Sequence, residues 1–144
     1  MTKRVMIQTW MSDGVKSVFD ARDDIEYEHF TELSEANIRQ HIGNYDGVML
    51  GIVPFTAAII EKADRLKIAS FHGVGYDPVD VEALTARGIP LSVVGSANSV
   101  TVAEHALFLM LALAKQGVLY DREVRKGNWD IRFQVPAVDL AGRK

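Results

Sequence analysis

The chain has 144 residues, 48% of them hydrophobic and 24% charged, with a formal net charge of −3. This balance is that of an ordinary globular protein, and the length fits one domain, or one domain and part of a second. Having no cysteine, the chain cannot use a disulfide framework, a thiolate nucleophile or cysteine-bound zinc, and its acidic charge argues against a nucleic-acid-binding surface.

Neither a leader peptide nor a membrane span is predicted. Lys3 and Arg4 precede only a short apolar stretch that carries no cleavage pattern. The longest unbroken apolar run, residues 106–114, is too short to cross a bilayer as a helix. We therefore expect a cytoplasmic protein with no membrane and no nucleic-acid partner.

Short apolar runs alternate with helical patterns up to residue 94. Strands are predicted at residues 5–7, 25–30, 48–53, 66–71 and 89–94, and helices start near residue 12 and span 34–41, 57–63 and 78–87. Five strands separated by four helices indicate an α/β fold with a doubly wound parallel sheet. The alternating charges of 25–30 suit an edge strand and the uniformly apolar 48–53 a central one, which predicts the flavodoxin-like order 2-1-3-4-5.

The rhythm changes after residue 94. Thr101 and Glu104 have the spacing of a capping box, which predicts the start of one long helix that runs to about Lys126. From 106 to 114 this helix is apolar nearly all round, so we expect it to be buried in a core or against a partner.

A glycine-rich stretch, His72-Gly73-Val74-Gly75-Tyr76-Asp77, follows the fourth predicted strand. In open α/β sheets ligands bind at this carboxyl edge, and the two glycines let backbone N–H groups approach an anion such as a carboxylate. A tight strand-to-helix turn explains the same residues, and the spacing does not separate the two interpretations.

A second small polar stretch, residues 95–99, precedes the long helix. Asn98 either caps that helix or offers its amide to a ligand. His105, flanked by apolar residues, is more typical of a packed histidine than of a catalytic one. No metal site is predicted, because the four histidines are scattered, and the chain contains neither a P-loop nor a serine nucleophile elbow.

Several segments in order resemble one family. They are residues 66–80 (LKIASFHGVGYDPVD), 86–90 (ARGIP), 97–99 (ANS), 102–107 (VAEHAL), 124–129 (VRKGNW) and 139–144 (DLAGRK). Together they resemble the D-isomer-specific 2-hydroxyacid dehydrogenases, with the phosphoglycerate dehydrogenase and glyoxylate/hydroxypyruvate reductase branches nearest. Residues before 66 match only in the rhythm of strands and helices.

The resemblance implies two domains and a set of site residues. Residues 1–97 would form a flavodoxin-like substrate domain, and 98–144 the first helix and lead-in of a Rossmann NAD-binding domain. The family's substrate carboxylate, from a small 2-hydroxy or 2-keto acid, would bind at Gly73, Val74 and Gly75, with Asn98 in the same cleft. Cofactor contacts would come from Ser99 and Val102, and the helix over 101–120 would form a homodimer.

The chain departs from the family where the chemistry is expected. It stops before the G-x-G-x-x-G turn, and the family's catalytic arginine, glutamate and histidine lie further on, so no catalytic residue is assigned here. We expect the chain to be the truncated, N-terminal part of an oxidoreductase that uses NAD or NADP, inactive by itself and binding neither cofactor.

Two other functions are alternatives to this one. A stand-alone, non-catalytic module that binds small carboxylates or dimerises remains open, and the reading frame beyond Lys144 would separate it from the enzyme. A phospho-acceptor receiver domain needs acidic residues after strands one and three, but those strands end in Gln8-Thr9-Trp10 and in 50–53 (LGIV), which excludes it.

Overall fold

The computed structural model describes residues 2–142 and consists of two compact units, Met1–Gly95 and Ser96–Lys144. Residues 1, 143 and 144 lie outside the described part, and with them the last two residues of the 139–144 segment. Each unit is described by itself below.

The first unit alternates strands and helices, as the apolar pattern predicted. Its elements in chain order are β1 (Lys3–Ile7), α1 (Asp13–Asp20), β2 (Ile25–His29), α2 (Glu35–His41), the 3-10 turn η1 (Ile42–Asn44), β3 (Gly47–Leu50), α3 (Ala57–Ile60), β4 (Ile68–Phe71), α4 (Val81–Ala86) and β5 (Leu91–Ser92).

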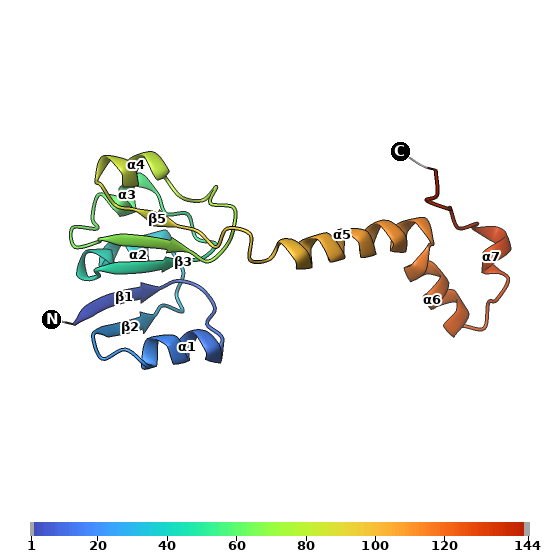
Figure 1. Ribbon diagram of the computed structural model, residues 1–144, viewed down its shortest axis with the longest axis horizontal. Helices are drawn as coiled ribbons and strands as arrows, with labels where there is room; N and C mark the ends of the chain where they lie inside the picture. The colour runs from blue at the N-terminus through green and yellow to red at the C-terminus, as the bar shows by residue number, and fades with distance from the viewer. Residues whose placement is uncertain (1, 143–144) are drawn as a thin grey trace. The chain divides into compact units, whose positions relative to one another are not determined.

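The five strands form one sheet in the order β2-β1-β3-β4-β5, and every pairing is parallel. Both the fold class and the strand order predicted from the sequence are confirmed. The strand arrows in Figure 1 lie side by side and point the same way, so their carboxyl ends share one edge of the sheet, where ligands bind in folds of this type.

One face of the sheet holds the core. Met6, Val48, Leu50 and Ala69 alternate along three neighbouring strands and are fully or almost fully buried. They pack in one cluster with side chains of α2, α3 and α4, namely Ile38, Ile59, Ile60 and Leu84. This continuous apolar burial stabilises the scaffold that positions the carboxyl edge.

Serine and aspartate side chains start three of the helices. Ser12 accepts a hydrogen bond from the Val15 N–H and Ser34 from the Asn37 N–H, so both predicted helix starts are confirmed. Asp80 likewise accepts from the Ala83 N–H and starts α4, later than the predicted residue 78.

Several predicted elements are shorter in the structure. β3 ends at Leu50 rather than at 53. The next residue, Gly51, passes so close to the loop after β1 that a side chain there would strike it. α3 ends at Ile60 rather than at 63, and β5 keeps only Leu91 and Ser92 of the predicted 89–94, since it pairs with β4 alone.

The second unit contains α5 (Ser99–Ala114), α6 (Gly117–Arg125) and α7 (Ile131–Gln134). The single helix predicted through Lys126 is therefore wrong: it breaks at Gln116, whose φ of 54° is left-handed, and α5 and α6 meet at 59°. A left-handed residue cannot continue a right-handed helix.

The start of α5 also differs from the prediction. The helix begins at Ser99, after Asn98, so Thr101 and Glu104 lie inside it and form no capping box. Within residues 2–142, no residue of α5 is buried, and most of its large apolar side chains are exposed. The sequence predicted that this helix is buried in a core or against a partner. Within the described residues, no core covers it.

No single helix among residues 2–142 is long and apolar enough to cross a bilayer. Only α5 and α6 taken together have that length and apolar character, and they are bent by 59° at the break between them.

Candidate functional site

Three neighbouring strands end close together at the carboxyl edge of the sheet. The Thr9 hydroxyl, just after β1, lies 3.2 Å from Nδ1 of His72, just after β4. The chain after β3 passes between them, where a Cβ on Gly51 would lie 2.6 Å from the Gln8 carbonyl oxygen and 3.1 Å from the Thr9 Cβ. Only glycine fits here without a shift of the backbone, so Gly51 allows the Thr9–His72 contact to form.

The loop after His72 is fixed at both ends. The His72 N–H donates to the Leu50 carbonyl at 3.0 Å, and the Gly73 carbonyl accepts from the Val94 N–H at 3.1 Å. Further on, the Val79 N–H donates to the Tyr76 carbonyl at 2.9 Å. These bonds tie the loop to β3, to the chain after β5 and to its own end.

Between these anchors lie two free backbone donors. Over residues 2–142, neither the Val74 N–H nor the Gly75 N–H donates a hydrogen bond to another group of the protein. Both residues are exposed, so the two N–H groups are open to solvent or to an anionic ligand.

The two glycines of the loop are needed for space rather than for a left-handed φ. Neither has a positive φ. A Cβ on Gly73 would lie 2.7 Å from the Phe71 ring, and one on Gly75 would lie 3.1 Å from the Asp77 carboxylate. A side chain at either position would therefore have to displace a neighbour.

The predicted residues of the second unit lie at the start of α5. Asn98 is the residue before the helix, and its side chain makes no capping bond. Ser99 and Val102 belong to the first helical turn, and Val102 is exposed. His105, one turn on, is exposed and lies tilted against the Phe108 ring with 5.9 Å between centroids.

The residues present do not make a dinucleotide site. The 144 residues contain no G-x-G-x-x-G turn, which would hold the pyrophosphate. Among residues 2–142, no group of three histidine or acidic side chains is placed to hold a metal ion.

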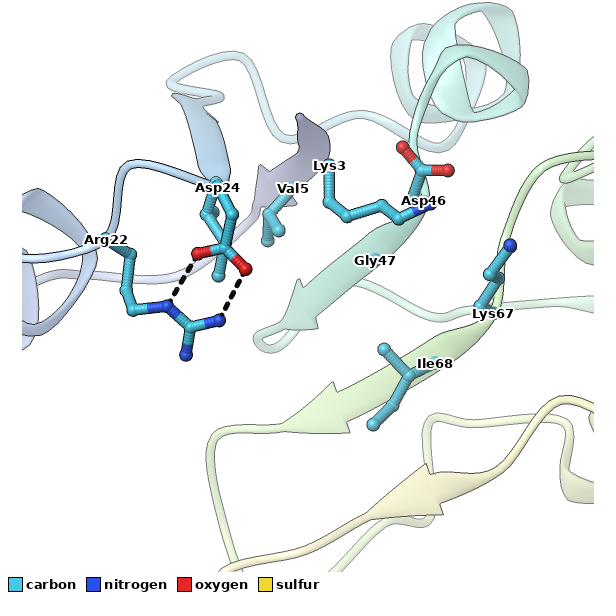
Figure 2. Close-up of a pocket in the computed structure, with 9 residues that line it drawn as sticks. Lys3, Val5, Arg22, Asp24, Asp46, Gly47, Lys67 and Ile68 are labelled. Carbon is cyan, nitrogen blue, oxygen red and sulfur yellow. Dashed lines mark hydrogen bonds and ion pairs between the residues drawn. The ribbon is translucent and has the colours of Figure 1, made fainter. Parts of the chain in front are cut away.

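A cavity of about 270 Å³ lies at the opposite, amino edge of the sheet. Figure 2 shows it between the Arg22–Asp24 pair on one side and Lys67 on the other. The Asp24 carboxylate accepts hydrogen bonds from both Nε and Nη2 of Arg22, each at 2.7 Å. Because ligands of such folds bind at the carboxyl edge, this cavity is not the candidate site.

Asp46 belongs to the structural framework of that amino edge. It is buried, and its carboxylate accepts from the Arg4 N–H at 3.0 Å and from Arg65 Nη2 at 2.9 Å. The Arg4 hydrogen bond, and then the charges of Arg65 and Lys3, hold the pKa of Asp46 below its usual value although burial opposes them.

Next to it, Tyr45 is buried and donates a hydrogen bond to Glu28. Burial and this hydrogen bond raise the pKa of Tyr45 to about 12, against the lowering effect of Arg4, whose guanidinium lies 4.9 Å from the ring centroid.

Sequence reasoning missed the Thr9–His72 contact. The sequence pattern gives His72 no role beyond its place at the start of the glycine-rich stretch, and it gives Thr9 no role in a site. No local signal could have joined them, because the contact depends on the strand order and on the small volume of Gly51.

Comparisons with known proteins point in one direction. The sequence model of the family "D-isomer specific 2-hydroxyacid dehydrogenase, catalytic domain" matches residues 5–134. The D-3-phosphoglycerate dehydrogenase of Archaeoglobus fulgidus is 32% identical over 123 residues, which cover 85% of this chain and 23% of that protein. The glyoxylate reductase of Pyrococcus furiosus is 41% identical over 131 residues, which cover 90% and 39%.

Solved structures agree with the sequence comparison. The NAD-dependent formate dehydrogenase from Staphylococcus aureus, in complex with NAD, superposes with a TM-score of 0.77 at 26% identity, covering 96% of this chain and 46% of that one. The chain thus spans less than half the length of each of these three proteins.

Proposed function

Because the chain belongs to the D-isomer specific 2-hydroxyacid dehydrogenase family, we propose that it forms the substrate-binding part of an oxidoreductase that interconverts a 2-keto acid and its D-2-hydroxy acid with NAD or NADP. The observation that carries the proposal is the pair of free N–H groups of Val74 and Gly75 at the carboxyl edge. Two adjacent backbone donors suit the two oxygens of a carboxylate, the group common to all such substrates.

In this proposal each site residue has one role. Val74 and Gly75 bind the substrate carboxylate, Gly73 keeps the loop narrow, and Asn98 is also assigned to substrate binding. Ser99 and Val102 are assigned to contacts with the nicotinamide. The domain division at residue 97 belongs to the same proposal.

The chemical step needs parts that these residues do not supply. Reduction of a keto group requires a hydride donor held in place and an acid beside the carbonyl oxygen. Since the residues present do not fit a dinucleotide, we assign no step of hydride or proton transfer to them, and we propose that the 144-residue polypeptide by itself binds substrate without turnover.

Two further parts of the proposal concern the whole protein. The exposed apolar side chains of α5 are those expected of an interface, which supports a homodimer formed through residues 101–120. The cytoplasmic location expected from the sequence belongs to the same proposal.

The carboxylate site is tested by titrating the ¹⁵N-labelled chain with glyoxylate up to about 20 mM, a range that detects millimolar dissociation constants. The amide signals of Val74 and Gly75 should shift in a saturable way. Glyoxylamide, which keeps the aldehyde but lacks the negative charge, serves as the matched control and should leave them in place. Equal shifts with both compounds, or none with glyoxylate, would contradict the proposal.

A stand-alone carboxylate-binding module makes the same prediction for glyoxylate. The two functions separate when the purified protein from its native source is assayed for glyoxylate-dependent oxidation of NADH or NADPH. Turnover supports the dehydrogenase, and binding without turnover in that preparation favours the module.

A further inference from the structure

Large apolar side chains are exposed at the edge where the proposed carboxylate site lies. Trp10 follows β1 and is 72% exposed, Ile52 follows β3 and is 87% exposed, and Val74 and Tyr76, in the loop after β4, are 44% and 49% exposed. Single exposed hydrophobic residues are normal, but a group from the loops after three neighbouring strands, at a ligand-binding edge, is typical of a surface that binds an apolar group.

The strand order brings these residues to neighbouring positions. β3 lies between β1 and β4, and the Thr9–His72 contact across Gly51 places the three strand ends at the same level. Trp10 directly follows Thr9, Ile52 directly follows Gly51, and Gly73 directly follows His72. The loops that carry Trp10 and Ile52 therefore neighbour the loop of Val74 and Gly75.

Charge is segregated between the two ends of the sheet. The loops at the carboxyl edge, residues 8–12, 30–34, 51–56, 72–80 and 93–95, include no lysine or arginine, and among them only His72 can carry a positive charge. Seven of the nine lysines and arginines of this unit lie at the other end, namely Lys3, Arg4, Arg22, Lys62, Arg65, Lys67 and Arg87. Arg39 is in the last turn of α2, and Lys16, in α1, is paired with Asp13. Phosphate groups in proteins are bound chiefly by arginine and lysine.

We infer that this unit selects 2-keto acids whose distal group is apolar and uncharged, and that Trp10 and Ile52 are the residues that contact that group. The inference rests on the proposed function, because it takes the carboxylate to lie at Val74 and Gly75. A phosphorylated acid would instead place a second negative charge against exposed apolar side chains and near the Asp77 carboxylate, which is energetically unfavourable.

Three probes on the ¹⁵N-labelled chain test this selectivity. Glyoxylate has no distal group, 4-methyl-2-oxopentanoate has an apolar one, and 3-phosphoglycerate has a phosphate. We expect 4-methyl-2-oxopentanoate to bind at least fivefold more tightly than 3-phosphoglycerate, by the saturation of shifts at Val74 and Gly75. A hydrophobic contact of one or two methyl groups is worth that factor or more.

Two substitutions and one control assign the effect to residues. Trp10→Ala and Ile52→Ala should each weaken 4-methyl-2-oxopentanoate about fivefold and leave glyoxylate unchanged. Val18→Ala removes a similarly exposed apolar side chain (67% exposed) from α1 and should alter neither ligand. Ile52→Arg should tighten 3-phosphoglycerate, since it adds the missing cation. The spectrum of each variant shows whether it is folded.

The outcomes distinguish the two proposals. If glyoxylate binds at Val74 and Gly75 but 3-phosphoglycerate binds as tightly as 4-methyl-2-oxopentanoate, or both alanine variants keep full affinity for the latter, the inference is wrong and the proposed function stands. If none of the three acids shifts the Val74 and Gly75 amides, the proposed carboxylate site is wrong and the inference fails with it.

Discussion

The Thr9 hydroxyl and the His72 imidazole lie 3.2 Å apart although 63 positions separate them in the chain. Their contact crosses the end of β3, and it is possible because Gly51 has no side chain. The loops after β1, β3 and β4 are thereby held at one level, next to the free N–H groups of Val74 and Gly75. A local steric requirement at one glycine thus shapes the proposed substrate edge.

Gly51→Ala should destabilise the first unit and break the Thr9–His72 contact. The new methyl group would lie 2.6 Å from the Gln8 carbonyl oxygen, so the backbone must move. Such overpacking costs about 1–3 kcal/mol, measurable as a lower midpoint of urea unfolding. In NMR spectra the His72 ring signals should shift.

Gly14→Ala is the matched control for that substitution. Gly14 is inside α1, and the nearest atom to its added Cβ is 3.8 Å away. Replacing a helical glycine that has free space should stabilise the chain by roughly 0.4–1 kcal/mol. Equal destabilisation by both substitutions would contradict the steric account of Gly51.

The sheet could be predicted because its signal is local. The uniformly apolar pattern of 48–53 predicts a central strand, and the alternating charges of 25–30 predict an edge strand. Each pattern is complete within a few residues. The break between α5 and α6 could not be read in this way. Glutamine is an ordinary helix former, so nothing at Gln116 in the sequence predicts a break. Its left-handed φ, just before α6 begins at Gly117, is seen only in the structure.

The candidate site likewise contains residues that a local pattern predicts and residues that it does not. The glycine-rich loop after β4 is a contiguous motif, so Gly73, Val74 and Gly75 could be singled out as a candidate. The apolar residues beside it come from loops that lie far apart in the sequence, and a single exposed tryptophan such as Trp10 has no local pattern. Only the strand order shows that the loops carrying Trp10 and Ile52 neighbour that loop.

Asp46→Asn should reduce stability at neutral pH and flatten its dependence on acid. The pKa of Asp46 is lowered in the folded state from a reference value of 3.8, so the carboxylate stabilises the fold above that value. This contribution is lost as the pH falls through the folded-state pKa. Hydrogen bonds to a charged group of this kind contribute on the order of 1.5–3 kcal/mol.

Urea unfolding from pH 7 to pH 2.5 measures both effects. Asp24→Asn is the control, because Asp24 also has a lowered pKa but belongs to an exposed pair with Arg22, and such pairs contribute little. If the Asp46 and Asp24 variants lost the same stability, burial of the Asp46 network would not be the cause.

Tyr45 should remain protonated until the pH approaches 12. Burial and the hydrogen bond to Glu28 raise its pKa to about 12 from a reference value of 10.0. Because the folded-state pKa is the higher one, this group contributes stability below pH 10 that is lost as the pH rises through 12. Absorbance titration at the tyrosinate band should show that Tyr45→Phe lacks a transition near pH 12 that the unmodified chain has. If the transition missing from the variant lay near pH 10 instead, the raised pKa of Tyr45 would be contradicted.

The 144-residue polypeptide should bind glyoxylate without reducing it. A hydride donor needs a pyrophosphate-binding turn to hold it, and these residues contain none. The measurement is NADH and NADPH absorbance with glyoxylate or hydroxypyruvate, with heat-denatured chain as the blank. Turnover above that blank would show that these residues do support the chemical step and that the proposal of binding without turnover is wrong.

The 144-residue polypeptide should also form a dimer through α5. Phe108, at 60% exposure, and Leu113, at 76%, belong to a run of large apolar side chains that the described chain leaves uncovered. Each Å² of apolar surface removed from water contributes about 25 cal/mol. Covering several such side chains therefore stabilises the protein by several kcal/mol, which is comparable to the stability of a small domain.

A two-fold partner that presents the same helix is the simplest closed arrangement. Sedimentation at micromolar concentration should give about twice the 16.0 kDa mass of one chain. The double substitution Phe108→Lys and Leu113→Lys should return the single mass, because it places like charges in the interface. Val18→Lys adds a charge at an exposed apolar position of α1 and should leave the dimer intact. A single mass for the unmodified chain, or dissociation by Val18→Lys alone, would assign the association to another surface or to none.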